Sequence, residues 1–347
     1  MQNSKEELRA AARLAMDDKV KPLGSLGMLE EWAVQLAVLQ GTLTPRIDRA
    51  RILIFAADHG VSAEGVSAYP REVTLEMTRT FSSGGAAINV LSRAAGLEVE
   101  VTDVGVDGDL SAMPGLVHAK VRRGTRSFLR EPALTPAEWE AAAEAGRQAV
   151  RRAAEAGAQA VGLGEMGIGN TTAAAALLSG LTGAAPEDTV GRGTGVTDEI
   201  LRHKREVVQG ALRLHAGPER ELRTLVAALG GLEMAAIAGA AQEGARRGLA
   251  VLVDGFISTV AVLSAVRLDP TIRPALFFAH RSAERGHRIA LETLDARPLL
   301  DLDMRLGEGT GAALALPILK AAADLMRDMA TFSQAGVSTS EPAPALR

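Results

Sequence analysis

Residues 51–57 read RILIFAA, a short continuous apolar run that stops at the polar turn Asp58-His59-Gly60. Further runs of this kind end in polar or glycine-rich turns, at residues 99–104, 158–163, 249–253, 275–279 and 299–304. Most of them are followed by a stretch with helical periodicity. Apolar strands that alternate with helices are typical of a parallel sheet covered on both faces. The pattern therefore predicts an α/β, Rossmann-like fold with a parallel six-stranded sheet flanked by helices.

The helical periodicity also indicates how the chain is divided. Candidate helices lie at residues 5–18, 26–40, 72–95, 137–156, 171–180, 197–214, 221–247, 256–266, 284–295 and 312–331. The first two precede the first strand, and the last follows the sixth. We therefore expect a small helical subdomain, residues 1–45 and 312–333, and a large α/β catalytic domain, residues 46–311. The tail, residues 334–347, is rich in Ser, Pro and Ala and is predicted to be disordered.

Composition narrows the class of protein. Hydrophobic residues make up 47% of the chain and aromatic residues only 3%, which predicts an aliphatic, alanine-rich core. The net charge is −4 without a basic stripe, which argues against nucleic acid as a partner. The chain has no cysteine, so disulfides, thiolate zinc sites and a cysteine nucleophile are excluded. Because it shows neither a signal-peptide core nor an apolar stretch of membrane-spanning length, we expect a cytoplasmic protein without membrane association.

Glu308 is the first candidate for chemistry. It stands among glycines in RLGEGTG, residues 305–311, directly after the apolar-acidic run 299–304. A strand that ends there would leave Glu308 at a carboxyl end of the sheet, where open α/β sheets bind ligands. Burial raises the pKa of a carboxyl group toward neutrality, which suits a general base. A turn or helix-capping glutamate is the alternative interpretation.

A second candidate is the glycine-rich turn GLGEMGIGNTT, residues 162–172. Its first six residues match a dinucleotide-binding pattern, but Glu165 inside the loop would repel a pyrophosphate, and the expected ribose-binding acid on a second strand is missing. Asn170 and Thr171 are N-cap types at the head of a helix, where backbone N–H groups and the helix dipole favour a single phosphate. An ordinary capped helix is the alternative. Glu165 would contact ribose hydroxyls or serve as a second carboxylate.

Residues 191–198, GRGTGVTD, form another glycine-rich turn before a helix, with Thr197 or Asp198 as its cap. On that helix His203, Lys204 and Arg205 follow one another. One of these cations, if it faces the site, would neutralise a phosphate. A solvated helix face is the alternative explanation.

Several other kinds of site are not supported. Asp58 and His59 could supply a metal ligand or a base, but the histidines show no metal-binding spacing, so no metal site is predicted. The sequence has no P-loop and no G-x-S-x-G element. Residues 251–259 superficially resemble the loop that binds the diphosphate sugar in ordinary phosphoribosyltransferases, but they lack its adjacent acidic pair. A magnesium–pyrophosphate substrate is therefore disfavoured.

Taken together, the motifs resemble one known family. The segments KPLGSLG (21–27), ADHGV (57–61), AYP (68–70), GGAAIN (84–89), GEMGIGNTT (164–172), GRGTG (191–195) and RLGEGTG (305–311) stand in order. From about residue 20 to residue 330 the chain resembles the nicotinate-nucleotide–dimethylbenzimidazole phosphoribosyltransferases, which make the lower-ligand nucleotide of cobalamin.

The resemblance implies a reaction. Phosphoribose would pass from nicotinate mononucleotide to 5,6-dimethylbenzimidazole with inversion at the anomeric carbon, giving α-ribazole 5′-phosphate and nicotinate. The pyridinium is already an activated leaving group, so neither a metal nor a cofactor is expected. Glu308 would be the general base that takes the N–H proton of the benzimidazole. The resemblance also implies a homodimer.

The same resemblance implies roles for further residues. Glu165, Gly167, Gly169 and Asn170 would hold ribose and phosphate, and Lys204 would bind phosphate. Asp254 and Ser282 would line the nucleotide pocket, and Gly307, next to the general base Glu308, would also bind substrate. Met77, Gly84 and Gly85 would flank the benzimidazole. Two alternatives stay open, a hydrolase that uses water in place of the aromatic base and a non-catalytic nucleotide-binding or scaffold protein. The physiological base is also open.

Overall fold

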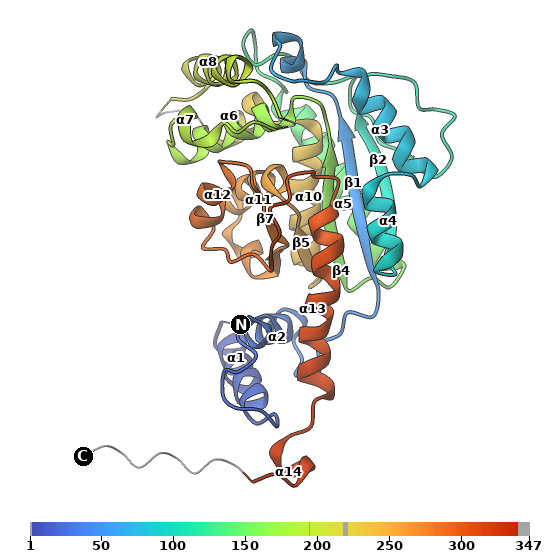
Figure 1. Ribbon diagram of the computed structural model, residues 1–347, viewed down its shortest axis with the longest axis vertical. Helices are drawn as coiled ribbons and strands as arrows, with labels where there is room; N and C mark the ends of the chain where they lie inside the picture. Colours follow the sequence, from blue (N-terminus) through green and yellow to red (C-terminus); the bar gives the residue numbers. More distant parts are fainter. Residues whose placement is uncertain (1, 194, 218–220, 339–347) are drawn as a thin grey trace, which may run out of the picture. The chain divides into compact units, whose positions relative to one another are not determined.

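The computed structural model describes residues 2–193, 195–217 and 221–338 (Figure 1). Contacts between residues divide the chain into two compact units. The larger unit is Arg49–Pro317, and the smaller unit joins the residues up to Asp48 with those from Ile318 onward. The sequence predicts these divisions after residues 45 and 311.

Six parallel strands form the central sheet of the larger unit, in the order β3-β2-β1-β4-β5-β6 (Figure 1). They are β1 (Ala50–Ala57), β2 (Glu98–Gly105), β3 (Leu116–His118), β4 (Ala160–Met166), β5 (Ala250–Val253) and β6 (Leu276–Phe278). The strand order changes direction at β1, which has β2 on one side and β4 on the other. Open α/β sheets bind ligands beyond the carboxyl ends of the strands at such a point. The predicted fold class is confirmed.

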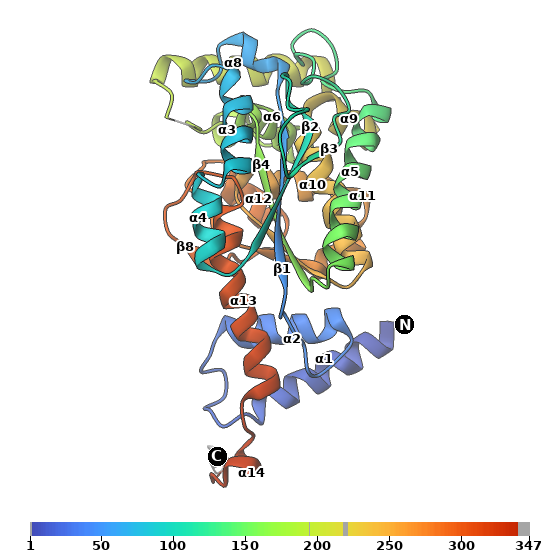
Figure 2. The same ribbon diagram turned by 90° about the vertical axis from the view of Figure 1, so that its right-hand side faces the viewer.

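Helices cover both faces of this sheet, as Figure 2 shows. The covering helices are α3 (Glu72–Ser83) and α4 (Ala87–Ala94) on one face, and α5 (Pro136–Glu155), α10 (Leu232–Arg246) and α11 (Phe256–Leu268) on the other. The core is aliphatic and rich in alanine, as predicted. A Cβ at Gly146 or Gly239 would overlap the backbone of the neighbouring helix, so α5 and α10 pack backbone against backbone.

Two predicted helices are each split by a pair of glycines. The stretch 72–95 forms α3 and α4, because Gly84 takes a left-handed φ of 81° and ends α3. The stretch 221–247 forms α9 (Leu222–Leu229) and α10, with Gly230 and Gly231 between them. The larger unit also contains α6 (Asn170–Thr182), α7 (Pro186–Thr189), α8 (Asp198–His215), α12 (His287–Thr293) and two 3₁₀ helices, Gly60–Glu64 and Pro270–Ala275.

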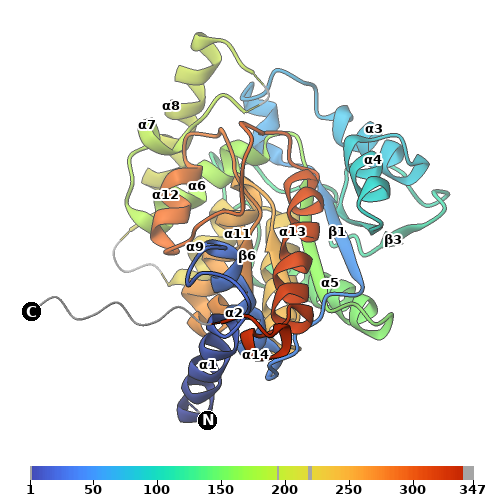
Figure 3. The ribbon, with the colours of Figure 1, turned by 60° about the horizontal axis from the view of Figure 1, so that its bottom comes forward.

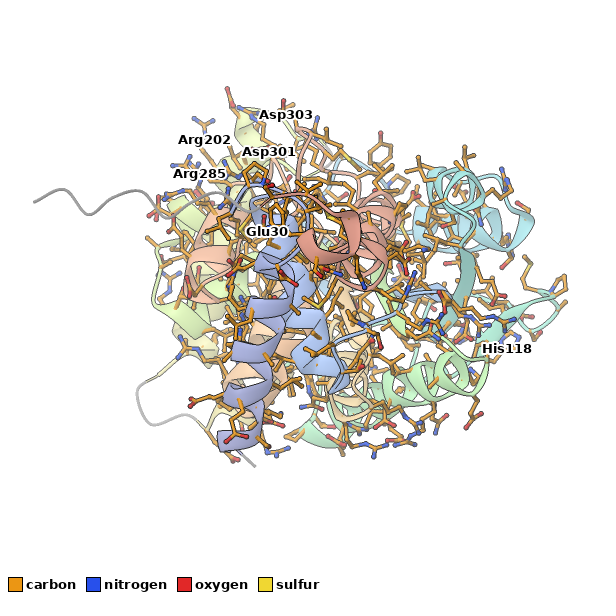
Figure 4. All side chains as sticks on the ribbon, turned by 90° about the horizontal axis from the view of Figure 1, so that it is seen from below. Glu30, His118, Arg202, Arg285, Asp301 and Asp303 are labelled. Atoms are coloured by element: carbon orange, nitrogen blue, oxygen red, sulfur yellow. The ribbon has the colours of Figure 1, made fainter. Side chains whose placement is uncertain are left out.

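The sixth strand of the sheet is not the one that the sequence predicts. Of the run 299–304, only Leu300–Asp301 is a strand, β8, and it pairs with β7 (His280–Arg281) in a separate two-stranded sheet. The acidic residues Asp301 and Asp303 are exposed (Figure 4), so this run is not a buried strand. The edge strand β3 takes the sixth place instead. It is short and buries only Leu116 fully, so it lacks the continuous apolar pattern that marks the inner strands.

The smaller unit is helical. α1 (Gln2–Asp17) and α2 (Met28–Gln40) pack together (Figure 3), and the C-terminal part of α13 (Thr310–Asp328) and α14 (Phe332–Ala335) belong to the same unit. The backbone N–H of Val20 donates to Ala330, which ties the two ends of the chain together. Lys21 and Glu30 form a buried ion pair at 2.9 Å.

The predicted disordered tail overlaps α14. Gln334 and Ala335 lie in this helix, although the sequence assigns the tail to residues 334–347. The helix begins with a capping box, in which Thr331 and Gln334 each accept a hydrogen bond from the backbone N–H of the other. Residues 339–347 of the predicted tail lie outside the described residues.

Candidate active site

A cavity of about 630 Å³ lies in the larger unit, at the end of β4 and the turn after β5. It brings together most of the predicted site residues, namely Met77, Glu165, Gly167, Asn170, Ser282, Gly307 and Glu308. Gly169 and Lys204 line a pocket of about 30 Å³ that shares Gly167, Asn170 and Thr171 with the cavity. The predicted site residues that line neither the cavity nor the small pocket are Asp254, Gly84 and Gly85.

Glu308 lies on the loop between β8 and α13, and not at the end of a strand as predicted. It has a left-handed φ of 64°, between Gly307 at 86° and Gly309 at 87°. This conformation costs a residue with a Cβ roughly 1–2 kcal/mol, so the surroundings must hold it. The loop presses on β4 so closely that a Cβ at Gly164 would lie 2.6 Å from the Glu308 carbonyl oxygen.

The Glu308 side chain faces the cavity and is 6% exposed as a residue. Its Oε2 accepts a hydrogen bond from the backbone N–H of Ile88, at the first turn of α4, over 3.4 Å. Burial raises the pKa of Glu308, and the nearby Asp254 adds to this, while the Ile88 N–H opposes it. A carboxylate with a raised pKa in a cavity can accept a proton near neutral pH.

The sequence predicts that Asp254 lines the nucleotide pocket, but Asp254 does not line the cavity. It follows β5 and is 1% exposed. Its Oδ2 accepts from the Gly309 N–H at 3.2 Å, and its Oδ1 accepts from the Ala312 N–H at 3.0 Å. Burial raises the pKa of Asp254 to about 7, against the effect of these N–H groups. Both oxygens of its carboxylate are therefore hydrogen-bonded to the backbone around the loop that carries Glu308.

Glu165, near the end of β4, is a second acid in the same cavity. It is buried and accepts a hydrogen bond from the Asn170 side chain. Burial raises the pKa of Glu165 well above its ordinary value, and the charges of Glu233, Asp254 and Glu308 raise it further. The charge of Glu308 in the same cavity therefore disfavours the ionisation of Glu165.

The small pocket lies at the N-terminus of α6. The N-cap is Gly169, with a φ of 94° and no side-chain cap, and not Asn170 as predicted. Asn170 is already the first residue of the helix, and its side-chain amide donates to Glu165. The positive end of the helix dipole therefore faces the pocket without a capping carboxylate or hydroxyl, which favours an anion. A volume of about 30 Å³ suits one small group and not a pyrophosphate.

Lys204 supplies the cation of this pocket. It lies on α8 and is 1% exposed, so it is not part of a solvated helix face. Its Nζ donates to the Thr171 hydroxyl at 3.2 Å. Burial lowers the pKa of Lys204 to about 8, and the charge of Glu284 opposes this shift. The predicted cap of α8 is confirmed, because Thr197 accepts from the Ile200 N–H.

An apolar wall closes another part of the cavity. It contains Tyr69, Val73, Met77, Met166 and Leu306. Sequence reasoning found Met77 and missed Val73, although both lie on α3 at a spacing of four residues and so on one helix face. The wall is suited to a flat aromatic ring.

Gly84 and Gly85 are predicted to flank the benzimidazole, but they serve the loop between α3 and α4. The Asn89 side chain joins the two helices there, since it donates to the Phe81 carbonyl and accepts from the Ala86 N–H. The short connection brings the Ile88 N–H to Glu308. The two glycines therefore act on the site indirectly.

Three further groups lie near the site, and of these the sequence indicates only His59, as a possible metal ligand or base. His59 and Glu233 form a buried pair at 2.8 Å. The His59 ring lies beneath the glycine turn, where a Cβ at Gly167 would come within 3.2 Å of it. Glu284 lines the cavity, and burial raises its pKa. Only the ADHG motif signals His59, and nothing in the local sequence marks Glu233 or Glu284.

Neither a metal centre nor a membrane span emerges from the described residues. Within them, no group of three or more His, Cys, Asp or Glu side chains is arranged to hold a metal ion. In the same part of the chain, no helix is long and apolar enough to cross a membrane.

The chain was compared with known proteins. A family model described as "Phosphoribosyltransferase" matches residues 1–337. The nicotinate-nucleotide–dimethylbenzimidazole phosphoribosyltransferase of Cupriavidus taiwanensis is 52% identical over 337 residues, which are 97% of either chain. The enzyme of that name from Thermus thermophilus is 54% identical over 333 residues, which are 96% of this chain and 98% of the relative.

A solved structure agrees with these relatives. The crystal structure of the enzyme of that name from Thermus thermophilus superposes with a TM-score of 0.92 at 51% identity, over 96% of this chain and 99% of that one. At this identity and coverage the likeness extends beyond the fold. The chain belongs to the nicotinate-nucleotide–dimethylbenzimidazole phosphoribosyltransferase family, and it is a phosphoribosyltransferase.

Proposed function

We propose that the protein transfers phosphoribose from nicotinate mononucleotide to 5,6-dimethylbenzimidazole, with Glu308 as the general base. The products are α-ribazole 5′-phosphate and nicotinate, in the assembly of the cobalamin nucleotide loop. The observation that carries this proposal is one cavity that combines a pocket for a single phosphate with a buried carboxylate beside an apolar wall. The names of the close relatives support the same pair of substrates.

The substrates fit the three parts of the cavity. The 5′-phosphate occupies the small pocket, where the N-terminus of α6 and Lys204 supply positive charge. The ribose lies along the glycine turn, with Glu165 and Ser282 as partners for its hydroxyl groups. The aromatic base lies against Val73 and Met77 with its ring N–H toward Glu308.

The reaction then needs one proton transfer. One ring nitrogen of the benzimidazole forms a bond to the anomeric carbon as the bond from that carbon to the pyridinium nitrogen breaks. The electron pair of the broken bond neutralises the pyridinium, and nicotinate leaves. The proton on the other ring nitrogen passes to Glu308. The anomeric carbon gains oxocarbenium character, which the negative charge of ionised Glu308 stabilises until the proton arrives.

Glu308→Gln tests the base directly. We expect kcat to fall by about 10²- to 10⁴-fold while the KM for nicotinate mononucleotide changes little, because only the proton acceptor is lost. Nicotinate release and the mass of the nucleotide product are measured with and without dimethylbenzimidazole. The matched control is Asp303→Asn, an exposed carboxylate of the same loop that also has a left-handed φ, of 54°. A Glu308→Gln variant with wild-type turnover would remove Glu308 as the base.

The same assay separates the alternative functions. Nicotinate release that does not depend on the added base would favour a hydrolase, and tight nucleotide binding without turnover would favour a scaffold. The apolar wall favours an aromatic acceptor over water. Competition among benzimidazoles, adenine and phenols, with products identified by mass, would establish the preferred base.

The homodimer, the cytoplasmic location and the lack of a nucleic-acid partner stay predictions. The dimer rests on the family resemblance alone. Light scattering of the purified protein at micromolar concentration would test it, and a mass of about 36.1 kDa would indicate a monomer.

A further inference from the structure

We propose that Asp254 is a positioning residue that holds Glu308 in its working conformation from beneath the loop, without contacting substrate. This inference rests on the proposed function of Glu308. It replaces the expectation that Asp254 lines the nucleotide pocket.

The backbone of the loop is the first part of the argument. Three successive residues, Gly307, Glu308 and Gly309, have left-handed φ values. Two of them are glycines, which adopt this conformation without strain, whereas Glu308 does not. A loop of this kind relaxes unless other contacts hold it.

Asp254 supplies those contacts from a different part of the chain. One carboxylate oxygen accepts from the N–H of Gly309, directly after Glu308, and the other accepts from the N–H of Ala312 in the first turn of α13. Asp254 thus caps α13 in the way that an N-cap aspartate caps its own helix. Because it follows the central strand β5, it ties the loop to the rigid sheet.

No other side-chain carboxylate bonds to the backbone of this loop among the described residues. The Thr310 hydroxyl donates to the Gly307 carbonyl, which closes the turn on itself without tying it to the sheet. The Ile88 N–H bonds to the side chain of Glu308 and not to its backbone. The two bonds to Asp254 are therefore the main tether between the Glu308 backbone and the sheet.

The charge of Asp254 acts on the same group. The titratable groups around it are Glu308 on the loop, Glu165 on β4 and His280 on β7, whose ring flanks Gly255 and Gly311. The charge of Asp254 raises the pKa of both Glu308 and Glu165. Because burial raises the pKa of Asp254 itself to about 7, this charge is largely lost below neutral pH, and the tether is tested through turnover and hydrogen exchange.

Asp254→Asn separates these effects from a loss of folding. The amide keeps one acceptor oxygen, but its NH₂ group opposes one of the two backbone N–H donors, so the loop is released. We expect kcat to fall by about 10- to 100-fold, as for a displacement of the reacting group by about 1 Å, with the KM for nicotinate mononucleotide within about threefold of wild type.

Asp103→Asn is a matched control. Asp103 is also 1% exposed and lies on β2, where its Oδ1 accepts from the backbone N–H groups of Gly105 and Val106 and its Oδ2 pairs with Lys120 at 3.1 Å. Its replacement should lower the melting temperature without lowering kcat per folded molecule. Hydrogen exchange read by mass spectrometry should be faster for peptide 306–313 only in Asp254→Asn.

Several outcomes would overturn the proposal. Wild-type kcat in folded Asp254→Asn, or unchanged exchange of peptide 306–313, would show that Asp254 does not position Glu308. A raised KM with normal kcat would show direct contact with substrate. If the wild-type protein turns over no base at all, the proposed function fails, whereas the exchange measurement still tests the tether.

Discussion

Gly164→Ala offers a sharp test of the geometry around Glu308, because it moves the loop without replacing any polar side chain. A Cβ at Gly164 would lie 2.6 Å from the Glu308 carbonyl oxygen and 2.7 Å from the Gly309 nitrogen. An ordinary contact begins at about 3.4 Å, so the loop must move by about 0.8 Å, which is the difference between 3.4 and 2.6 Å. The obstacle is backbone, which cannot rotate away as a side chain can.

The expected result is a loss of turnover with binding largely kept. A displacement of about 1 Å costs on the order of 10²-fold in rate, so we expect kcat to fall by roughly that factor. The KM for nicotinate mononucleotide should change little, because the phosphate pocket begins at Gly167 on the far side of Glu165 and Met166. Overpacking of this kind should also cost about 1–3 kcal/mol of the free energy of unfolding.

Gly162→Ala is the matched control for this experiment. It lies two residues earlier on β4 and so on the same face, and its Cβ would lie 2.5 Å from the Ile52 Cδ1 and 3.0 Å from the Ala312 Cβ. Since the Ile52 atom ends a flexible side chain, this variant should lose stability but keep its turnover. Steady-state nicotinate release and thermal unfolding are measured on both variants. If Gly164→Ala and Gly162→Ala keep equal turnover per folded molecule, the position of the loop does not limit the reaction.

Two further predictions concern binding and pH. Lys204→Met should raise the KM for nicotinate mononucleotide by about 10- to 100-fold, because a charged hydrogen bond contributes about 1.5–3 kcal/mol; initial rates over a range of nucleotide concentrations would check this, and an unchanged KM would exclude Lys204 as a phosphate ligand. The contribution of Asp254 to the free energy of unfolding should rise as pH falls from about 7 toward 4, because folding raises the pKa of Asp254 from 3.8 to about 7 and so favours its protonated form. Burial lowers the pKa of His287 from 6.5 to about 3, which costs stability over part of the same range, so the contribution of Asp254 is the difference in unfolding free energy between wild type and Asp254→Asn. The free energy of unfolding of the wild type should fall between pH 4.5 and 2, because the arginines around Glu243 lower its pKa from 4.5 to about 2 and its stabilising contribution is lost on protonation. Urea titrations of both proteins would test this, and a difference between them that stays constant from pH 7 to 4 would contradict the raised pKa of Asp254.

Much of the fold is predictable because inner strands carry their signal locally. The runs that became β1, β4, β5 and β6 are mainly apolar on both faces, since helices cover both sides of the sheet. The run that became β2 alternates glutamate and valine at its start and is buried only over its second half. The edge strand β3 does not need apolar residues on both faces. The run 299–304 contains apolar residues, but it is exposed and does not form a buried strand. Whether each of these two segments becomes a strand of the central sheet depends on its contacts with segments far along the chain.

The candidate site, like the fold, is predictable from the sequence only in part. Glu308, Glu165 and Lys204 stand in motifs whose glycines and caps are local, so the sequence identifies them. Asp254 also stands at a strand end, but whether its carboxylate meets a substrate or a backbone N–H depends on a loop that lies fifty-five residues away in sequence. Gly84 and Gly85 are conspicuous in the sequence, yet they act through the Ile88 N–H.

The sequence by itself determines the α/β class and marks both the glycine turn before α6 and the acid that faces the cavity, because each depends on residue type and spacing over a short stretch. Only the tertiary structure decides that Glu308 is held in a strained left-handed conformation and that Asp254 is bonded to its loop. Lys204 likewise becomes a buried cation, and not a solvated one, only when α8 packs beside α6. These features arise from burial and from hydrogen bonds between segments distant in sequence, and no local pattern encodes them.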